Sequence, residues 1–70
     1  QVSVDISSVI SSSSLGLNTI IDENVYIRNS VLGKNCFVGK NTKVINSILL
    51  DNVEIESGVE VRNSIIGQGT

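Results

Sequence analysis

Residues 32–48 read LGKNCFVGKNTKVINSI, and this stretch decides the fold because the chain repeats it. The 17 residues before it, 15–31, read LGLNTIIDENVYIRNSV, and the 17 after it, 49–65, read LLDNVEIESGVEVRNSI. The same residue classes occupy the same positions in all three copies, so the sequence has a period of 17 residues. A fixed period of this kind is typical of proteins built from stacked structural repeats.

Each copy divides into two blocks of six residues and one block of five, and every block opens with an aliphatic residue. These aliphatic residues are Leu15, Ile21, Ile27, Leu32, Val38, Val44, Leu49, Ile55, Val61 and Ile66. One block is long enough for a short strand and a turn, so three blocks predict one triangular coil of a parallel β-solenoid. We therefore expect an all-β domain over residues 1–70, with about four coils of 6 + 6 + 5 residues.

The alternation of side chains along a strand predicts which residues fill the interior. The aliphatic residue that opens each block points inward, and so does the small residue two positions earlier in the sequence. At the end of the five-residue block this small residue is Ser30, Ser47 or Ser64. Such an interior is too narrow for aromatic side chains. This explains why the chain has one Phe, one Tyr and no Trp.

The turns between blocks carry a separate signal, because asparagine or glycine recurs at each of them. The residues are Asn18, Asn24, Asn29, Asn35, Asn41, Asn46, Asn52, Gly58, Asn63 and Gly69. Both residue types tolerate a positive φ angle, so we expect a left-handed backbone conformation at every corner.

Charged residues separated by one period also support the alignment. Glu23 is expected to face Lys40, Lys34 to face Asp51, and Lys43 to face Glu60. Each exposed pair contributes only a few tenths of a kcal/mol, so these pairs indicate the register and not a binding site.

Residues 1–14 are expected to form an irregular first coil, whereas residues 15–70 form regular coils. The tetrapeptide at residues 8–11 echoes the one at residues 30–33, but residues 10–14 fit equally well as the five-residue side before Leu15. The sequence does not decide between these two alignments of the first 14 residues. We also expect the chain to be a fragment of a longer protein, because the first coil is incomplete and another begins at Ile66.

Composition excludes several functions. The net charge is −2 and the five basic residues are scattered, which argues against a nucleic-acid partner. No apolar run approaches the roughly 18 to 20 residues that a membrane span needs, and no signal peptide is visible. The single cysteine suits an intracellular chain, so we expect a cytoplasmic protein.

No catalytic constellation is visible in the sequence. Hexapeptide solenoids are best known as acyltransferases with a histidine general base, and this chain has no histidine. It also lacks a phosphate-binding glycine-rich loop and the histidine ligands of a zinc site. Cys36 falls in a small inward position, which favours a packed thiol over a nucleophile. We therefore expect a segment that is not an enzyme and holds no cofactor or metal.

The candidate partner-binding residues are apolar residues that point outward. On the five-residue side these are Val31, Ile48 and Ile65, with Leu50 beside them, and the equivalent position on the first six-residue side holds Ile20 and Phe37. A contiguous exposed apolar surface usually marks an interface. The alternative is that β-branched residues stand there for their strand propensity. The partner is either another chain or another domain of the same protein.

Several motifs resemble those of a known family. The strings IRNSVLGKNC, VINSILLDNVEIESGVEV and RNSIIG are similar to the C-terminal left-handed β-helix of the nucleotidyltransferase-like proteins. That group includes sugar-nucleotide pyrophosphorylases and the gamma and epsilon subunits of eukaryotic translation initiation factor 2B. The Asn-Ser-aliphatic-aliphatic-Gly step and the opening VSVD and SSVIS are most similar to the gamma subunit.

The resemblance implies a left-handed coil and a role in translation initiation. It implies a non-catalytic assembly module of the guanine-nucleotide exchange factor, as its gamma or its epsilon subunit. For the gamma type it implies a hetero-oligomer with an epsilon-type subunit and with the initiation factor 2 complex as a further partner. The alternative is the oligomerisation or regulatory β-helix of a sugar-1-phosphate nucleotidylyltransferase. A third possibility is an acyltransferase solenoid whose active site lies outside this segment.

Overall fold

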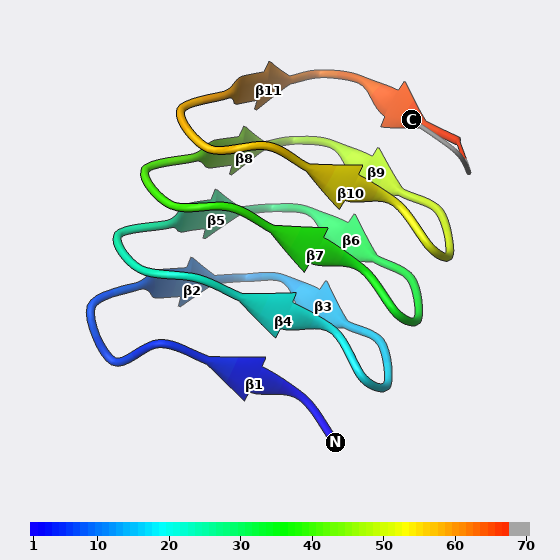
Figure 1. Ribbon diagram of the computed structural model, residues 1–70. Coiled ribbons are helices and arrows are strands. Elements are labelled where there is room, and N and C mark those ends of the chain that lie inside the picture. The colour runs from blue at the N-terminus through cyan, green and yellow to red at the C-terminus, as the bar shows by residue number, and fades with distance from the viewer. Residues whose placement is uncertain (68–70) are drawn as a thin grey trace.

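A computed structural model describes residues 1–67, which form short β-strands joined by turns (Figure 1). The strands are β1 (Ser3–Val4), β2 (Val9–Ser11), β3 (Ser14–Leu15), β4 (Ile20–Ile21), β5 (Tyr26–Arg28), β6 (Val31–Leu32), β7 (Phe37–Val38), β8 (Lys43–Ile45), β9 (Ile48–Leu49), β10 (Glu54–Ile55), β11 (Glu60–Arg62) and β12 (Ile65–Ile66). No helix occurs within residues 1–67. The all-β prediction is confirmed.

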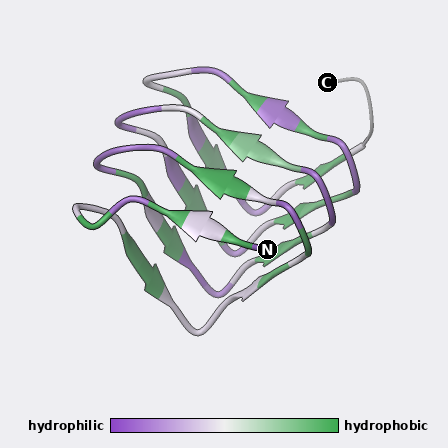
Figure 2. Ribbon diagram, turned by 60° about the horizontal axis from the view of Figure 1, so that its bottom comes forward, coloured by the Kyte–Doolittle hydropathy of each residue, from purple (hydrophilic) through white to green (hydrophobic). Residues whose placement is uncertain are grey.

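The strands form three parallel four-stranded sheets, which are the three sides of a prism (Figure 2). We call the sheet β1-β4-β7-β10 the first wall, β2-β5-β8-β11 the second wall, and β3-β6-β9-β12 the third wall. Paired residues are 17 apart on every wall, as in Ile20 with Phe37 and Val31 with Ile48. In Figure 1 the chain rises from the N-terminus, crossing the front from right to left and returning across the back from left to right. This sense of rotation makes the coil left-handed. The predicted period and the predicted fold class are both confirmed.

The interior consists of aliphatic columns facing columns of small residues. Leu15, Leu32, Leu49 and Ile66 lie in one column through successive strand pairs. The buried members of the core are Ile21, Val25, Ile27, Leu32, Cys36, Val38, Val44, Leu49, Val53, Ile55 and Val61. Burial of these side chains is the main favourable term in folding, since removing apolar surface from water gains about 25 cal/mol per Å².

The serines of the interior form hydrogen bonds with backbone N–H and carbonyl groups on the five-residue side. The Ser30 hydroxyl donates to the Arg28 carbonyl oxygen at 2.9 Å and accepts the Ser47 backbone N–H at 3.1 Å. Ser47 repeats this arrangement with the backbone N–H of Ser64 at 3.2 Å. Serine therefore recurs because it is small enough for the corner and links each coil to the next. Within residues 1–67, no buried side-chain nitrogen or oxygen lacks a hydrogen-bond partner.

The corners adopt the left-handed conformation that their asparagines predict. The residues with positive φ are Ser12, Asn18, Asn24, Asn29, Asn35, Asn41, Asn46, Asn52, Gly58 and Asn63. The asparagine φ angles run from 51° to 63°, where most other residues would be strained. Of the predicted corner residues, Gly69 lies outside the described residues.

The structure decides between the two registers left open for the N-terminal residues. Ile10 pairs with Ile27, so residues 10–14 form the five-residue side, and Ser12 has a φ of 50° in the place of Asn29. The corner after β1 is built differently. The Asp5 carboxylate accepts hydrogen bonds from the Ser7 hydroxyl at 2.6 Å and the Ser7 backbone N–H at 3.0 Å. This Asx turn closes the corner with no left-handed residue.

Two expected inward residues are exposed, and two of the three pairs of charged residues that face each other as predicted do not form an ion pair. Val59 and Ser64 are exposed, because no described coil lies above them. Glu23 pairs with Lys40 at 3.9 Å as predicted. Lys43 lies opposite Glu60 in the strand register as predicted, but Glu60 forms its ion pair with Arg62 on its own strand. The Asp51 carboxylate accepts the backbone N–H of Lys34. Exposed ion pairs are weak, so a nearer donor easily replaces the partner in the next coil.

Candidate partner-binding surface

The third wall has an outer surface without charged side chains. Two outward columns run up this wall, and every residue in them is aliphatic, serine or glycine. They contain Ser14, Val31, Ile48 and Ile65, and Gly16, Gly33, Leu50 and Gly67. An uncharged column of aliphatic side chains is the composition expected for the centre of a protein–protein interface.

Three aliphatic side chains form a continuous strip on this wall. Val31 lies next to Ile48, and Ile48 lies next to Ile65, on β6, β9 and β12. Neighbouring strands are about 4.8 Å apart, so the three side chains are in contact range of one another. Their exposed fractions are 50%, 41% and 72%. We call Val31, Ile48 and Ile65 the apolar strip.

Glycine beside the strip is required by the close stacking of the coils. A Cβ atom on Gly33 would lie 2.8 Å from the backbone nitrogen of Asp51, and one on Gly16 would lie 2.5 Å from the carbonyl carbon of Gly33. Both distances are too short for a side chain to be accommodated. The column of Gly16 and Gly33 is therefore flat below Leu50 and leaves the apolar strip accessible. Leu50 is 45% exposed and extends the apolar surface toward the corner that joins the third wall to the first.

The structure separates Ile20 and Phe37 from the apolar strip. Both belong to the first wall, where Ile20 on β4 pairs with Phe37 on β7. Ile20 is 49% exposed and Phe37 is half-buried. The six candidate residues therefore lie on two walls, four on or beside the third and two on the first. One surface of a partner contacts both groups only by wrapping around the intervening corner.

Leu17 lies at that corner and is exposed, and our sequence reasoning did not include it. The signal was present, because the corresponding positions in the next two copies hold Lys34 and Asp51. An aliphatic residue where other copies have a charge is unusual on a solvated corner. Leu17 thus extends the exposed apolar surface from the third wall toward Ile20.

The second wall mixes three basic residues with one acidic residue and with apolar and polar residues such as Val9 and Tyr26. Its outward residues include Arg28, Lys43 and Arg62, with Glu60 paired to Arg62. Ile45 lies between Arg28 and Arg62 in its column and is only 8% exposed. The aliphatic parts of long cationic side chains commonly cover apolar neighbours in this way.

The described residues offer little for catalysis or metal binding. Cys36 is buried, and its sulfur lies 3.2 Å from the Leu50 carbonyl oxygen. Residues 1–67 contain no group of three or more metal-ligating His, Cys, Asp or Glu side chains. None of the described segments is a helix of the length and hydrophobicity required to cross a membrane.

One carboxylate has a perturbed acidity. The hydrogen bond from the Ser7 hydroxyl, followed by the one from the Ser7 backbone N–H, holds the pKa of Asp5 below its ordinary value of 3.8. Both bonds stabilise the ionised form, and the group is open to solvent. The shift therefore follows from the Asx turn at the first corner.

Comparison with known proteins agrees with this architecture. No curated protein matches the chain. A family model described as the EIF2B subunit epsilon LbH domain matches residues 1–70, LbH denoting a left-handed β-helix. The match covers the whole chain, and the three walls form such a helix. The chain therefore belongs to the family of EIF2B left-handed β-helix domains.

Proposed function

We propose that this chain is a non-catalytic assembly module of the eIF2B guanine-nucleotide exchange complex, and that the apolar strip on its third wall binds a neighbouring subunit. The observation that carries the proposal is an uncharged, aliphatic outer wall on a domain of an eIF2B family. Contiguous exposed apolar surface is rare on isolated proteins and usually marks an interface. A cytoplasmic location and participation in translation initiation follow from this proposal.

The non-catalytic role is supported by the side chains that the chain provides. It has no histidine, and its one cysteine is packed in the interior. None of the described carboxylates belongs to a group of three or more His, Cys, Asp or Glu side chains that could hold a metal ion. General acid–base catalysis needs a group whose pKa and geometry are matched to a bound substrate. The chain is better suited to a scaffold than to an active site.

We propose further that the chain is a gamma-type subunit and that its partner is an epsilon-type subunit. The support is the Asn-Ser-aliphatic-aliphatic-Gly step, seen at residues 29–33 and 63–67, which is most similar to the gamma subunit. The matching family carries the epsilon description, so the experiment must separate the two assignments. The same match favours eIF2B over a sugar-1-phosphate nucleotidylyltransferase.

Sedimentation of the full chain with each purified subunit tests both points. We expect association with the epsilon subunit of eIF2B and none with the gamma subunit. Ile48→Asp places a charge at the centre of the strip and removes an aliphatic contact. Complete burial of an isoleucine is worth roughly 1.5–3 kcal/mol, so the Kd should rise at least about tenfold.

The matched control is Lys43→Asp, which introduces the same residue in the same coil on the exposed face of the second wall. It should leave the Kd unchanged, and both variants should keep the far-UV circular dichroism of the parent. An unchanged Kd for Ile48→Asp means that the strip is not the interface. Association with the gamma subunit alone assigns the chain to the epsilon type.

A further inference from the structure

The first wall differs from the other two because its outer surface combines acidic and apolar side chains. Its two outward columns contain Ser3, Ile20, Phe37 and Glu54, and Asp5, Asp22, Gly39 and Glu56. Four of these residues are acidic and none is basic. By contrast, the second wall carries three basic residues and one acidic residue, and the third wall is uncharged, so four carboxylates are concentrated on one side of the prism.

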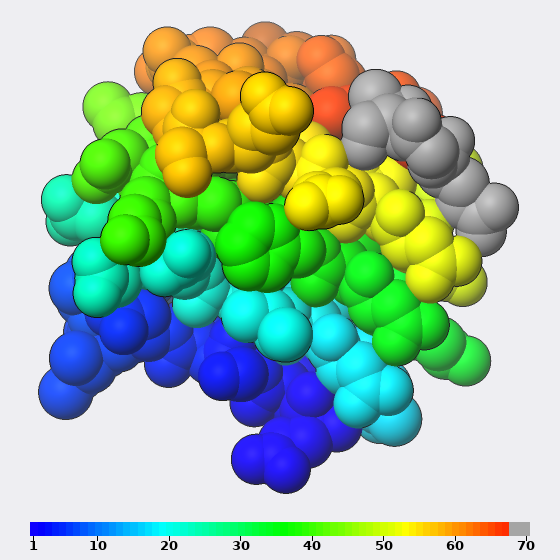
Figure 3. Space-filling view, in the orientation of Figure 1, coloured from blue at the N-terminus to red at the C-terminus, as the bar shows by residue number. Residues whose placement is uncertain are grey.

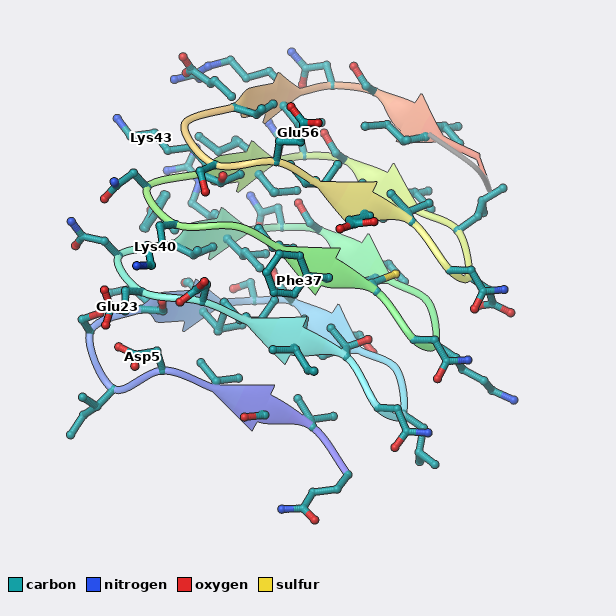
Figure 4. All side chains as sticks on the ribbon, in the orientation of Figure 1. Asp5, Glu23, Phe37, Lys40, Lys43 and Glu56 are labelled. Carbon is teal, nitrogen blue, oxygen red and sulfur yellow. The ribbon has the colours of Figure 1, made fainter. Side chains whose placement is uncertain are left out.

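A groove on this wall joins the apolar and acidic groups. It is lined by Val4, Ile6, Ile20 and Phe37 together with Asp5 and Asp22. Ile6 is 99% exposed at the corner after β1. Figure 4 shows Phe37 on this wall with Asp5 near the lower end and Glu56 above, and Figure 3 shows the surface of the molecule from the same side.

Asp5 and Asp22 accept hydrogen bonds from the backbone N–H groups of Ser7 and Glu23, but the first-wall carboxylates have no cationic partner within the described residues. Glu23 has a lysine neighbour in the next coil, whereas Asp5 lies directly below Asp22 in the same column. Within residues 1–67 the ion pairs join Glu23 to Lys40 and Glu60 to Arg62, and neither involves a carboxylate of this wall. A cationic ligand would supply the opposite charge that these carboxylates lack.

We propose that the first wall is a second docking surface, which binds a basic segment of a partner protein through one apolar anchor and flanking lysine or arginine side chains. The anchor seats in the groove against Ile20 and Phe37. The cationic side chains reach Asp5 and Asp22 at one end of the wall and Glu54 and Glu56 at the other. Apolar contact supplies affinity, and charge complementarity supplies orientation and selection against acidic segments. This surface is separate from the apolar strip, so the domain holds two partners on different walls.

Fluorescence anisotropy with the full chain and labelled synthetic peptides tests the proposal. The probe is a short peptide in which leucine alternates with lysine. One comparison peptide has glutamate in place of lysine, and the other has serine in place of leucine. We expect binding of the leucine–lysine peptide alone, with an affinity that falls as salt rises because the contacts are charged.

Two kinds of variant locate the site. Phe37→Ser removes the anchor contact, and the double variant Asp22→Asn with Glu56→Gln removes charge while keeping shape. Each should weaken peptide binding by roughly tenfold or more, the loss typical of a central interface contact. Since Phe37 is half-buried, the isosteric double variant keeps the test decisive if Phe37→Ser is unstable.

Controls on the other walls separate this proposal from the assembly role. Ile48→Asp and Lys43→Gln should leave peptide affinity unchanged, whereas Ile48→Asp alone should weaken subunit association. Equal binding of the serine–lysine peptide, equal binding of the leucine–glutamate peptide, or full affinity in the double variant overturns the proposal. None of these outcomes affects the conclusion about the apolar strip.

Discussion

Replacing Leu32 by alanine measures how much one interior column contributes to stability. Leu32 on β6 is 2% exposed and lies between Leu15 in the coil below and Leu49 in the coil above. Truncation leaves a cavity that the flanking coils can fill only partly, because the hydrogen bonds between the strands fix their spacing. Buried leucine-to-alanine changes cost about 2–5 kcal/mol.

This loss is large relative to the stability of the whole chain. Proteins are stable by roughly 0.05–0.15 kcal/mol per residue, which for 70 residues is on the order of 4–10 kcal/mol. For a domain of this size each kcal/mol lowers Tm by about 4–8 °C. We therefore expect Leu32→Ala to lower Tm by at least about 8 °C and to remove a large share of the free energy of unfolding.

The same column provides the matched control. Leu15 has the same side chain in the same column but is only half-buried, because one coil alone packs against it. Leu15→Ala should cost about half as much as Leu32→Ala, and Leu17→Ala, at an exposed corner, should stay within about 0.5 kcal/mol of the parent. Urea unfolding followed by far-UV circular dichroism gives all three values. Equal losses at Leu15 and Leu32, or a loss below about 1 kcal/mol at Leu32, would refute the assignment of this column to the interior.

Two local features give further predictions. Asn35 has a φ of 58°, so Asn35→Ala should lower the free energy of unfolding by about 1–2 kcal/mol through backbone strain, whereas Asn35→Gly should cost less; equal costs in urea unfolding contradict this explanation. Ser7→Ala should raise the pKa of Asp5 toward 3.8, as followed by NMR titration of the carboxyl carbon. The pKa of Asp5 is lower in the folded state than in the unfolded state, so the Ser7 bonds stabilise the protein above the ordinary pKa. This stabilisation is lost as pH falls through the folded-state pKa, so the free energy of unfolding of the variant should depend less on pH in that acidic range.

The three walls divide the surface of the domain by chemistry. The third wall is uncharged and apolar, the second wall is mixed with an excess of basic residues, and the first wall is acidic with an apolar groove, so the outer residues of each wall can be replaced separately. The interior is shared, because the columns of all three walls pack together in one core. Substitutions on a wall should therefore change binding, and substitutions in the columns should change stability.

Most of the fold was predictable from the sequence because its determinants are local and repeated. The period of 17 residues predicts which strands pair, and the pairing of Leu15 with Leu32 and of Leu32 with Leu49 confirms it. Asparagine at the corners predicts positive φ because the preference belongs to the residue and its own backbone. The left-handed coil followed from family resemblance and not from these local rules, since generic parallel crossovers are right-handed.

The candidate site was only partly predictable. Alternation along a strand shows that Val31, Ile48 and Ile20 point outward, and all three are exposed. The division into blocks also predicts that Ile20 lies on a different side from the other two, and the sheet order confirms it. The sequence reasoning did not include Leu17, which is exposed at the corner between these sides.

Charge partners and the first corner also required the structure. Glu60 selects Arg62 rather than Lys43, and Asp5 with Ser7 closes a turn without a left-handed residue. Flexible exposed side chains choose among several near neighbours at almost equal free energy, and the choice depends on their positions in space. The period of the repeat and the backbone conformation that each residue prefers are local properties, so both can be determined from the sequence. The grouping of side chains into walls, grooves and pairs exists only once the coils are stacked.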